Sequence, residues 1–295
     1  MSSSSSTPRS STPATTGTAT PSSYLSSQIN KSSTMDSPTD LAKPRILCLH
    51  GGGVNSEVFR LQCRSLIKHM GTDFRFVFAD GPWFCDPGPG IVPVYQDYGP
   101  FRRWLRWLPD QPCLDDEAAT EEIFYELERC KCEDDQRGAT GEWVGLLGFS
   151  QGAKLAASLL YDQQIRREKF GHDTTAAGSA STTNYRFAVL LAGRNPLVSF
   201  GEYSRSPALV PAGGLSEGFE YDRQSPHILR LPTLHVHGLG DAGLHLHRRL
   251  REQYCDPDTS EVVEWDGDHR VPIKWKDVQP IKEWVDKIAR KEGLL

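Results

Sequence analysis

The chain has 295 residues, of which 38% are hydrophobic and 24% are charged, the composition of a globular protein with one large α/β domain or two smaller ones. Its formal net charge of -5 and isoelectric point near 6.0 argue against a surface that neutralises phosphates, so we expect no nucleic-acid partner. No stretch approaches the ~20 continuous apolar residues of a membrane-spanning helix, and the N-terminus lacks the order of a secretory signal. The sequence therefore predicts a cytoplasmic protein without a membrane partner.

The first 43 residues differ from the rest of the chain. They are rich in Ser and Thr with almost nothing hydrophobic, which predicts a disordered tail. A mitochondrial presequence is the alternative, because no acidic residue precedes Asp36, but only Arg9 and Lys31 supply positive charge there.

Seven cysteines are scattered along the chain, and we expect them to be mostly reduced and structural. The pair Cys130 and Cys132 has no second closely spaced pair to complete a zinc site. We therefore predict no metal site and no cofactor.

From residue 44 onward, strand and helix patterns alternate. Short apolar strands are expected at 45–49, 74–79, 143–148, 187–192, 233–237 and 262–265. Helices are expected from Ser56, as a cap, through 67, at 116–130, after Ser150, at 244–253 and at 280–290. This order predicts an α/β domain over 44–295 with a mostly parallel central sheet covered by helices on both faces. Residues 80–112 are expected to be irregular, and about 169–184 to be an inserted loop.

The segment VGLLGFSQGAKLAASLL, residues 144–160, reads as a strand that turns into a helix through Gly148-Phe149-Ser150-Gln151-Gly152. This is the setting of the G-x-S-x-G nucleophile turn, in which Ser150 sits on a strained backbone. The backbone N–H of Gln151, near the helix start, would then face a developing negative oxygen. A glycine-bounded turn with an idle serine is the alternative.

A second oxyanion donor is expected from His50-Gly51-Gly52-Gly53, which follows the first strand. The N–H of Gly52 is the first choice and that of Gly53 the second. Phosphate binding is the alternative for a glycine-rich loop, but neither established phosphate-loop spacing is present.

Two later strand ends supply candidates for the remaining catalytic groups. Asp241 lies in a turn after the strand at 233–237, as a triad acid would, although it could also cap the next helix. His269 lies in the loop after the last strand, where a general base is expected. The chain order Ser150, Asp241, His269 is the order of α/β-hydrolases.

Aromatic residues crowd the irregular segment 80–112. We name Trp83, Tyr98 and Trp104 as candidate substrate contacts for an apolar acyl chain. Packing of these rings onto the core is the alternative.

These motifs together resemble the small eukaryotic α/β-hydrolases called the family of serine hydrolases, which includes fungal enzymes. The resemblance rests on LCLHGGGVNSEVFRLQ, on the turn at 80–82, on RRWLRW, on GFSQGA and on the Asp241 and His269 contexts. It implies an α/β-hydrolase fold and a thioesterase or esterase of secondary metabolism. Ser150 would be the nucleophile, His269 the base and Asp241 the acid, with Gly52 and Gln151 as oxyanion donors.

The resemblance further implies a small-molecule or carrier-protein-bound acyl substrate, with a polyketide synthase as a candidate partner. A general carboxylesterase is the alternative activity, and a binding protein on a hydrolase scaffold is a third hypothesis.

Overall fold

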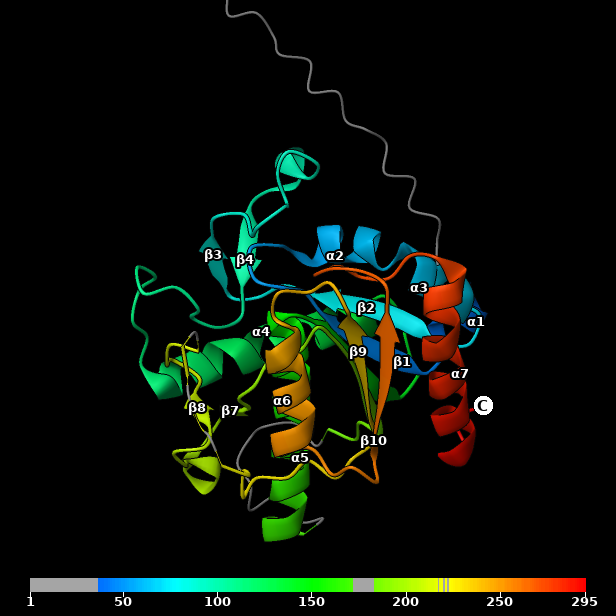
Figure 1. The fold of residues 1–295 in the computed structure, drawn as a ribbon. Helices are drawn as coiled ribbons and strands as arrows, with labels where there is room; N and C mark the ends of the chain where they lie inside the picture. Colours follow the sequence, from blue (N-terminus) through cyan, green and yellow to red (C-terminus); the bar gives the residue numbers. More distant parts are fainter. Residues whose placement is uncertain (1–36, 172–182, 217, 220, 222) are drawn as a thin grey trace, which may run out of the picture. The chain divides into compact units, whose positions relative to one another are not determined.

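A parallel sheet of six strands forms the centre of the computed structural model, which describes residues 37–171 and 183–295 except 217, 220 and 222 (Figure 1). The strand order is β10-β9-β6-β5-β1-β2. The strands are β1 (Arg45–Leu49), β2 (Arg75–Ala79), β5 (Trp143–Phe149), β6 (Phe187–Leu191), β9 (Thr233–Gly238) and β10 (Ser260–Trp265). All the pairings between neighbours are parallel, which confirms the expected architecture.

Helices cover both faces of this sheet. The helices α4 (Asp116–Gln136), α5 (Gln151–Phe170) and α6 (Leu244–Tyr254) pack in one apolar cluster. The helices α2 (Ser56–Gln62), α3 (Arg64–Met70) and α7 (Trp275–Lys291) pack in the other. Alternate residues of β1 enter alternate clusters, with Leu47 and Leu49 on the α5 side and Ile46 and Cys48 on the α7 side, because side chains alternate along a strand.

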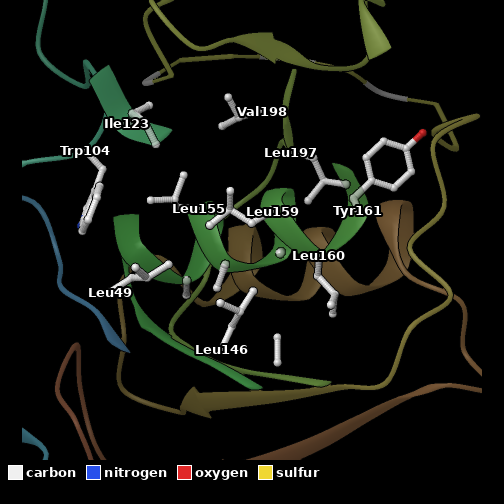
Figure 2. Close-up of a cluster of buried hydrophobic side chains, with 14 of the residues drawn as sticks. Leu49, Trp104, Ile123, Leu146, Leu155, Leu159, Leu160, Tyr161, Leu197 and Val198 are labelled. Carbon is white, nitrogen blue, oxygen red and sulfur yellow. The ribbon is translucent and has the colours of Figure 1, made fainter. Parts of the chain in front are cut away.

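Much of α5 is buried in an apolar cluster (Figure 2). Leu155, Ala156 and Leu160 have no exposed surface, and Leu146 of β5 lies below them. Close packing therefore holds α5 against the sheet, starting directly after Ser150. The nucleophile turn is thus fixed by the packed strand before it and the packed helix after it.

Several boundaries differ from the sequence-based expectation. Helix α4 continues to Gln136 because Asp134 is buried and paired, and α7 begins at Trp275, so that Pro280 lies inside it. Asn55, not Ser56, caps α2: its side chain accepts from the N–H of Val58.

The segment expected to be irregular contains an antiparallel hairpin. Its strands are β3 (Trp83–Cys85) and β4 (Phe101–Arg103), and the short helix η1 (Gln96–Tyr98) lies between them. Further short elements are β7 (Val198–Ser199), η2 (Glu202–Ser204) and β8 (Val210–Pro211). Among the described helices, none is both long and apolar enough to cross a membrane.

The described part of the chain begins at Ser37, seven residues before the expected start of the domain at residue 44. Helix α1 (Pro38–Leu41) is capped by Ser37, and the carbonyl of Leu41 accepts from the N–H groups of Thr140 and Gly141. Residues 1–36 and 172–182, which hold most of the expected tail and of the expected inserted loop, lie outside the described residues.

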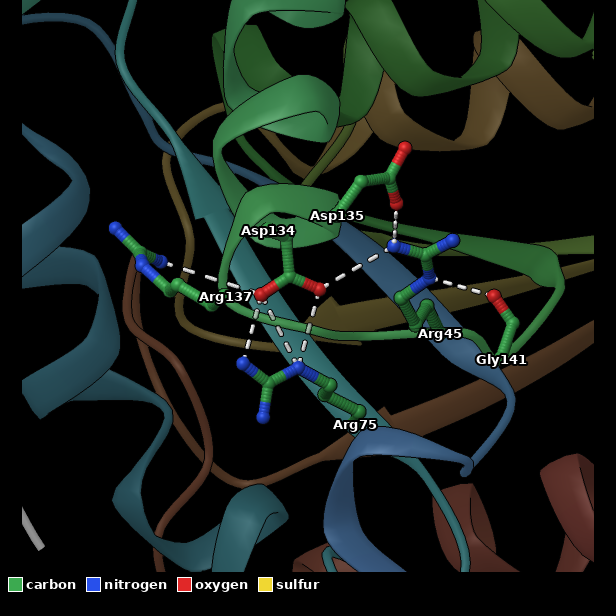
Figure 3. Close-up of polar contacts among 6 residues, drawn as sticks. All are labelled: Arg45, Arg75, Asp134, Asp135, Arg137 and Gly141. Carbon is green, nitrogen blue, oxygen red and sulfur yellow. Dashed lines mark hydrogen bonds and ion pairs between the residues drawn. The ribbon is translucent and has the colours of Figure 1, made fainter. Parts of the chain in front are cut away.

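A buried carboxylate joins α4 to the N-terminal ends of β1 and β2 (Figure 3). Asp134 has no exposed surface and pairs with Arg75 at 2.7 Å and with Arg45 at 3.4 Å. Arg45 also binds the half-exposed Asp135. The network ties the helix to both strands at the edge opposite the strand ends that carry the candidate catalytic residues.

Replacing Asp134 with alanine should cost about 3–5 kcal/mol of unfolding free energy, because it removes the buried carboxylate that pairs with the largely buried Arg75 and Arg45 and leaves Arg45 only the half-exposed Asp135. The matched control is Asp135→Ala, whose carboxylate is 54% exposed and whose loss should cost no more than about 1 kcal/mol. Urea unfolding measures both variants. Equal losses for the two would show that burial of Asp134 is not what gives it weight.

Candidate active site

The nucleophile turn joins β5 to α5, and steric contacts explain its glycines. Ser150 has φ 54° and ψ -114°, a left-handed φ that a side chain rarely adopts. A Cβ on Gly148 would lie 2.2 Å from the carbonyl oxygen of Gly152, and one on Gly152 would lie 2.0 Å from that of Leu49. Only glycine fits both positions, so the turn stays tight and presents the Ser150 hydroxyl at the carboxyl end of the sheet.

Asp241 and His269 reach the same place from the ends of neighbouring strands. Asp241 follows β9 and His269 follows β10, which pair in parallel. His269 Nε2 lies 2.9 Å from Ser150 Oγ, and His269 Nδ1 lies 2.6 Å from Asp241 Oδ2. The structure thus brings together Ser150, Asp241 and His269, the three residues proposed from the sequence.

The surroundings of Asp241 favour its ionised form. Burial alone would raise the pKa of the Asp241 carboxyl, but the N–H of Gly243, which donates to Oδ1 at 2.7 Å, and His269 hold it below its usual range. Because an ionised carboxylate only accepts, His269 Nδ1 carries the proton, and its Nε2 is left to accept from the Ser150 hydroxyl. Helix α6 is capped by Gly243, so Asp241 does not take the capping role that was its alternative.

The oxyanion loop distinguishes its two candidate glycines. The N–H of Gly53 donates to the carbonyl of Arg102 at 3.0 Å and is therefore occupied. No acceptor is recorded for the N–H of Gly52 within the described part of the chain. Gln151 is the first residue of α5, so its N–H has no acceptor within the helix either. These two donors follow the first strand and the nucleophile, as expected.

His50 controls how this loop is oriented. Its Nε2 accepts from the N–H of Gly81 at 2.9 Å, so Nδ1 carries the proton and donates to the carbonyl of Gly51 at 2.7 Å. Burial lowers the pKa of His50 to about 4, so the ring stays neutral. In a planar trans peptide the carbonyl and the next N–H point in opposite directions. Holding the Gly51 carbonyl therefore fixes the direction of the Gly52 N–H.

Replacing His50 with leucine should lower kcat about 100-fold with little change in KM, because a misdirected Gly52 N–H loses the value of one oxyanion donor. The measurement is steady-state hydrolysis of a p-nitrophenyl ester. His235→Leu is the matched control: His235 is also buried, but it lies within β9 and holds no part of the loop, so its kcat should be unchanged. A similar kcat in both variants would contradict the orienting role.

The side chain of Gln151 has a role that its motif position did not indicate. Its Oε1 accepts from the N–H groups of Trp104 and Leu105 at 2.7 and 3.1 Å, and its Nε2 donates to the carbonyl of Leu105. The residue that follows the nucleophile therefore fastens the segment after β4 to the turn.

The candidate substrate contacts fare differently. Trp104 is fully buried, and its indole N–H donates to the carbonyl of His50, so the expectation that it contacts substrate is wrong: the ring packs in the core. Trp83 is half-buried, with the Arg103 guanidinium over its ring. Tyr98 is 36% exposed on η1 and lies edge to face with Tyr95.

Trp107 is one of the aromatic residues of segment 80–112, but it was not among the three candidates selected from the sequence. A Cβ on Gly52 would lie 3.0 Å from its six-membered ring, so this half-buried indole lies directly against the oxyanion loop. The motif RRWLRW, already part of the family resemblance, contains it and was the available signal. Trp107 is thus an aromatic ring that lies against the candidate donor Gly52.

His247 of α6 also lies at the site and was not expected there. It is fully buried, and its Nε2 lies 3.6 Å from Asp241 Oδ2. Asp241, His247 and His269 place one ligand atom each within 4.8 Å of one another.

The seven cysteines are all free.

Comparisons with known proteins identify the family of the chain. The family model described as "Serine hydrolase (FSH1)" matches residues 38–281. "Esterase pigG" of Monascus ruber is 51% identical over 259 residues, covering 85% of this chain and 93% of that protein. "Esterase claE" of Penicillium crustosum is 46% identical over 271 residues, covering 90% and 100%.

Among solved structures, a carboxylesterase from Mesorhizobium loti is similar at 16% identity and a TM-score of 0.46, covering 84% of this chain and 92% of that one. The family match extends over most of the chain and contains all of the site described above. The chain therefore belongs to the serine hydrolase (FSH1) family.

Proposed function

We propose that the chain hydrolyses an acyl ester or thioester through Ser150, His269 and Asp241. The observation that carries this proposal is the continuous hydrogen-bonded chain from Ser150 Oγ through His269 to Asp241, with bonds of 2.9 and 2.6 Å. Ser150 attacks the acyl carbonyl while His269 Nε2 takes its proton and returns it to the leaving group. Water then attacks the acyl-enzyme by the same route. Asp241 holds the Nδ1 tautomer and stabilises the imidazolium.

The tetrahedral oxyanion of each step needs donors that are in place beforehand. We assign the N–H groups of Gly52 and Gln151 to this role, because both lie beside the nucleophile turn and neither is used by the fold. His50 supports the first donor through Gly51, and the packing of α5 supports the second. All of these residues lie in the hydrolase domain, which we assign to residues 37–295.

For the acyl group, we propose an apolar or aromatic chain of secondary metabolism, of the polyketide kind, as a free ester or on a carrier protein of a polyketide synthase. The similarity to the fungal esterases supports hydrolysis of an ester. The position of Trp107 against Gly52 supports an aromatic-walled acyl site. Trp83 and Tyr98 are candidates for its outer wall. The free cysteines support a reducing, cytoplasmic compartment.

The test of the catalytic assignment is labelling of the full chain with a fluorophosphonate probe, followed by peptide mapping of the modified residue. We expect one label on Ser150 and none on the Ser150→Ala variant. A label on any other serine, or no label, would contradict the assignment of the nucleophile.

The test of the substrate class compares kcat/KM for matched oxygen esters and thioesters that share one aromatic acyl group. Preference for the thioester supports product release from a carrier, while an equal or higher value for the oxygen ester supports the alternative of a general carboxylesterase. Trp107→Ala should lower kcat/KM for the aromatic acyl group about 10-fold more than for acetyl, because the lost ring contact is worth of the order of 1.4 kcal/mol.

A further inference from the structure

The imidazole of His247 is buried at the candidate active site and makes no hydrogen bond within the described residues. Its side chain has no exposed surface, and neither ring nitrogen has a hydrogen-bond partner among the described residues. Its Nε2 points to Asp241 Oδ2 across 3.6 Å, too far for a good hydrogen bond. Leaving both nitrogens of a buried imidazole unpaired costs free energy, so the position calls for a ligand.

The atoms around this imidazole form a set that suits one class of ligand. Asp241, His247 and His269 offer one carboxylate oxygen and two ring nitrogens within 4.8 Å of one another, the one such group within the described residues. Two imidazoles and a carboxylate with an open fourth position are the donors of many zinc sites, whereas Mg²⁺ and Ca²⁺ prefer oxygen alone. We propose that Asp241, His247 and His269 bind Zn²⁺ reversibly, and that the bound ion stops catalysis.

The charges of the group are those that a zinc site needs. In its neutral form the buried His247 imidazole offers one ring-nitrogen lone pair to a metal. Asp241 supplies the negative charge. The positive charge of the Arg194 guanidinium, which acts on His247, opposes a dication. We therefore expect an ion that exchanges with solvent, entering past His269, whose side chain is 35% exposed.

Zinc and catalysis compete for the same imidazole, that of His269, through its two ring nitrogens. To bind Zn²⁺, His269 must offer the lone pair of Nδ1, so its single proton moves from Nδ1 to Nε2 and no net proton is released. An Nε2–H cannot accept the Ser150 proton, and the 2.6 Å approach of Nδ1 to Asp241 must open to admit the ion. The inhibitory half of this proposal rests on the proposed function, whereas the binding half rests on the ligand geometry alone.

The binding test uses the full chain carrying Ser150→Ala, so that it does not depend on activity. ZnCl₂ is titrated in competition with a chromogenic chelator, alone and with a second substitution. We expect one tight equivalent in Ser150→Ala and in the control with His245→Gln, an exposed histidine of the same helix. His269→Gln, at a partly exposed position that folding tolerates, and His247→Gln should each weaken binding by at least about 10- to 100-fold. Equal binding in all variants, or none in any, overturns the site.

The inhibition test follows fluorophosphonate labelling of the unsubstituted chain with ZnCl₂ and then with excess EDTA. Zinc should slow the labelling of Ser150 and EDTA should restore it, and His245→Gln should behave in the same way. Labelling at an unchanged rate with zinc bound overturns the inhibitory half. A chain that is never labelled, even without zinc, contradicts the proposed function and leaves the binding result to stand or fall by itself.

Discussion

Replacing Ser150 with alanine should lower kcat about a million-fold while leaving the fold intact, because all bond-making in the proposed cycle passes through its hydroxyl. The fold should tolerate the change, since the turn is held by the contacts of Gly148 and Gly152 and by the packing of α5, not by the serine side chain. The measurement is single-turnover hydrolysis of an activated ester with thermal unfolding recorded beside it. An unchanged melting temperature assigns the loss to chemistry.

A double-variant comparison shows whether Ser150 acts with His269. If the two work as one unit, His269→Ala alone should cost nearly as much as Ser150→Ala, and the double variant should cost little more than either. The residual rate, set by the oxyanion donors and by binding, should then be common to all three. Losses that multiply would mean that His269 is not the base of Ser150.

The fold and the triad positions were predictable because each depends on local sequence. Continuous apolar strands alternating with helices allow few arrangements other than a parallel sheet, and carboxyl ends of parallel strands meet at one edge. Ser150 follows β5 directly, and Asp241 and His269 lie in the turns after β9 and β10, so all three were expected at the same edge of the sheet. The strained backbone at Ser150 was also predictable, because glycines stand at positions 148 and 152.

Features that depend on contacts between distant segments were not predictable. The sequence does not show which tryptophan of RRWLRW is buried. Trp104 packs in the core, with its backbone N–H bound to the Gln151 side chain. Trp107 lies against Gly52 of the oxyanion loop. The extension of α4 depends on Arg45 and Arg75, about sixty to ninety residues before Asp134 in the chain. The sequence does not distinguish His247 from the other histidine of its helix. Its place at the candidate active site depends on the packing of α6 near Asp241.

Replacing Asp241 with asparagine should lower kcat about 10,000-fold, far more than the loss of one charge at the surface of a protein. The reason lies in the N–H of Gly243, which donates to Asp241 Oδ1 at 2.7 Å and needs an acceptor. The asparagine carbonyl must take that place, so its NH₂ group faces His269 Nδ1. The imidazole must then accept at Nδ1 and carry its proton at Nε2, the wrong tautomer for accepting a proton from Ser150.

The control for this variant is Asp268→Asn, which removes an equal charge next to His269 in sequence. Asp268 is exposed and pairs with Arg270 at 3.2 Å, so its kcat should stay within a few-fold of the unsubstituted chain. The measurement is kcat for one activated ester in both variants, with NMR of the imidazole nitrogens reporting the tautomer. If Asp241→Asn loses activity but keeps Nδ1–H, the orientation of the asparagine amide is not the cause, and loss of the negative charge that stabilises the imidazolium must be.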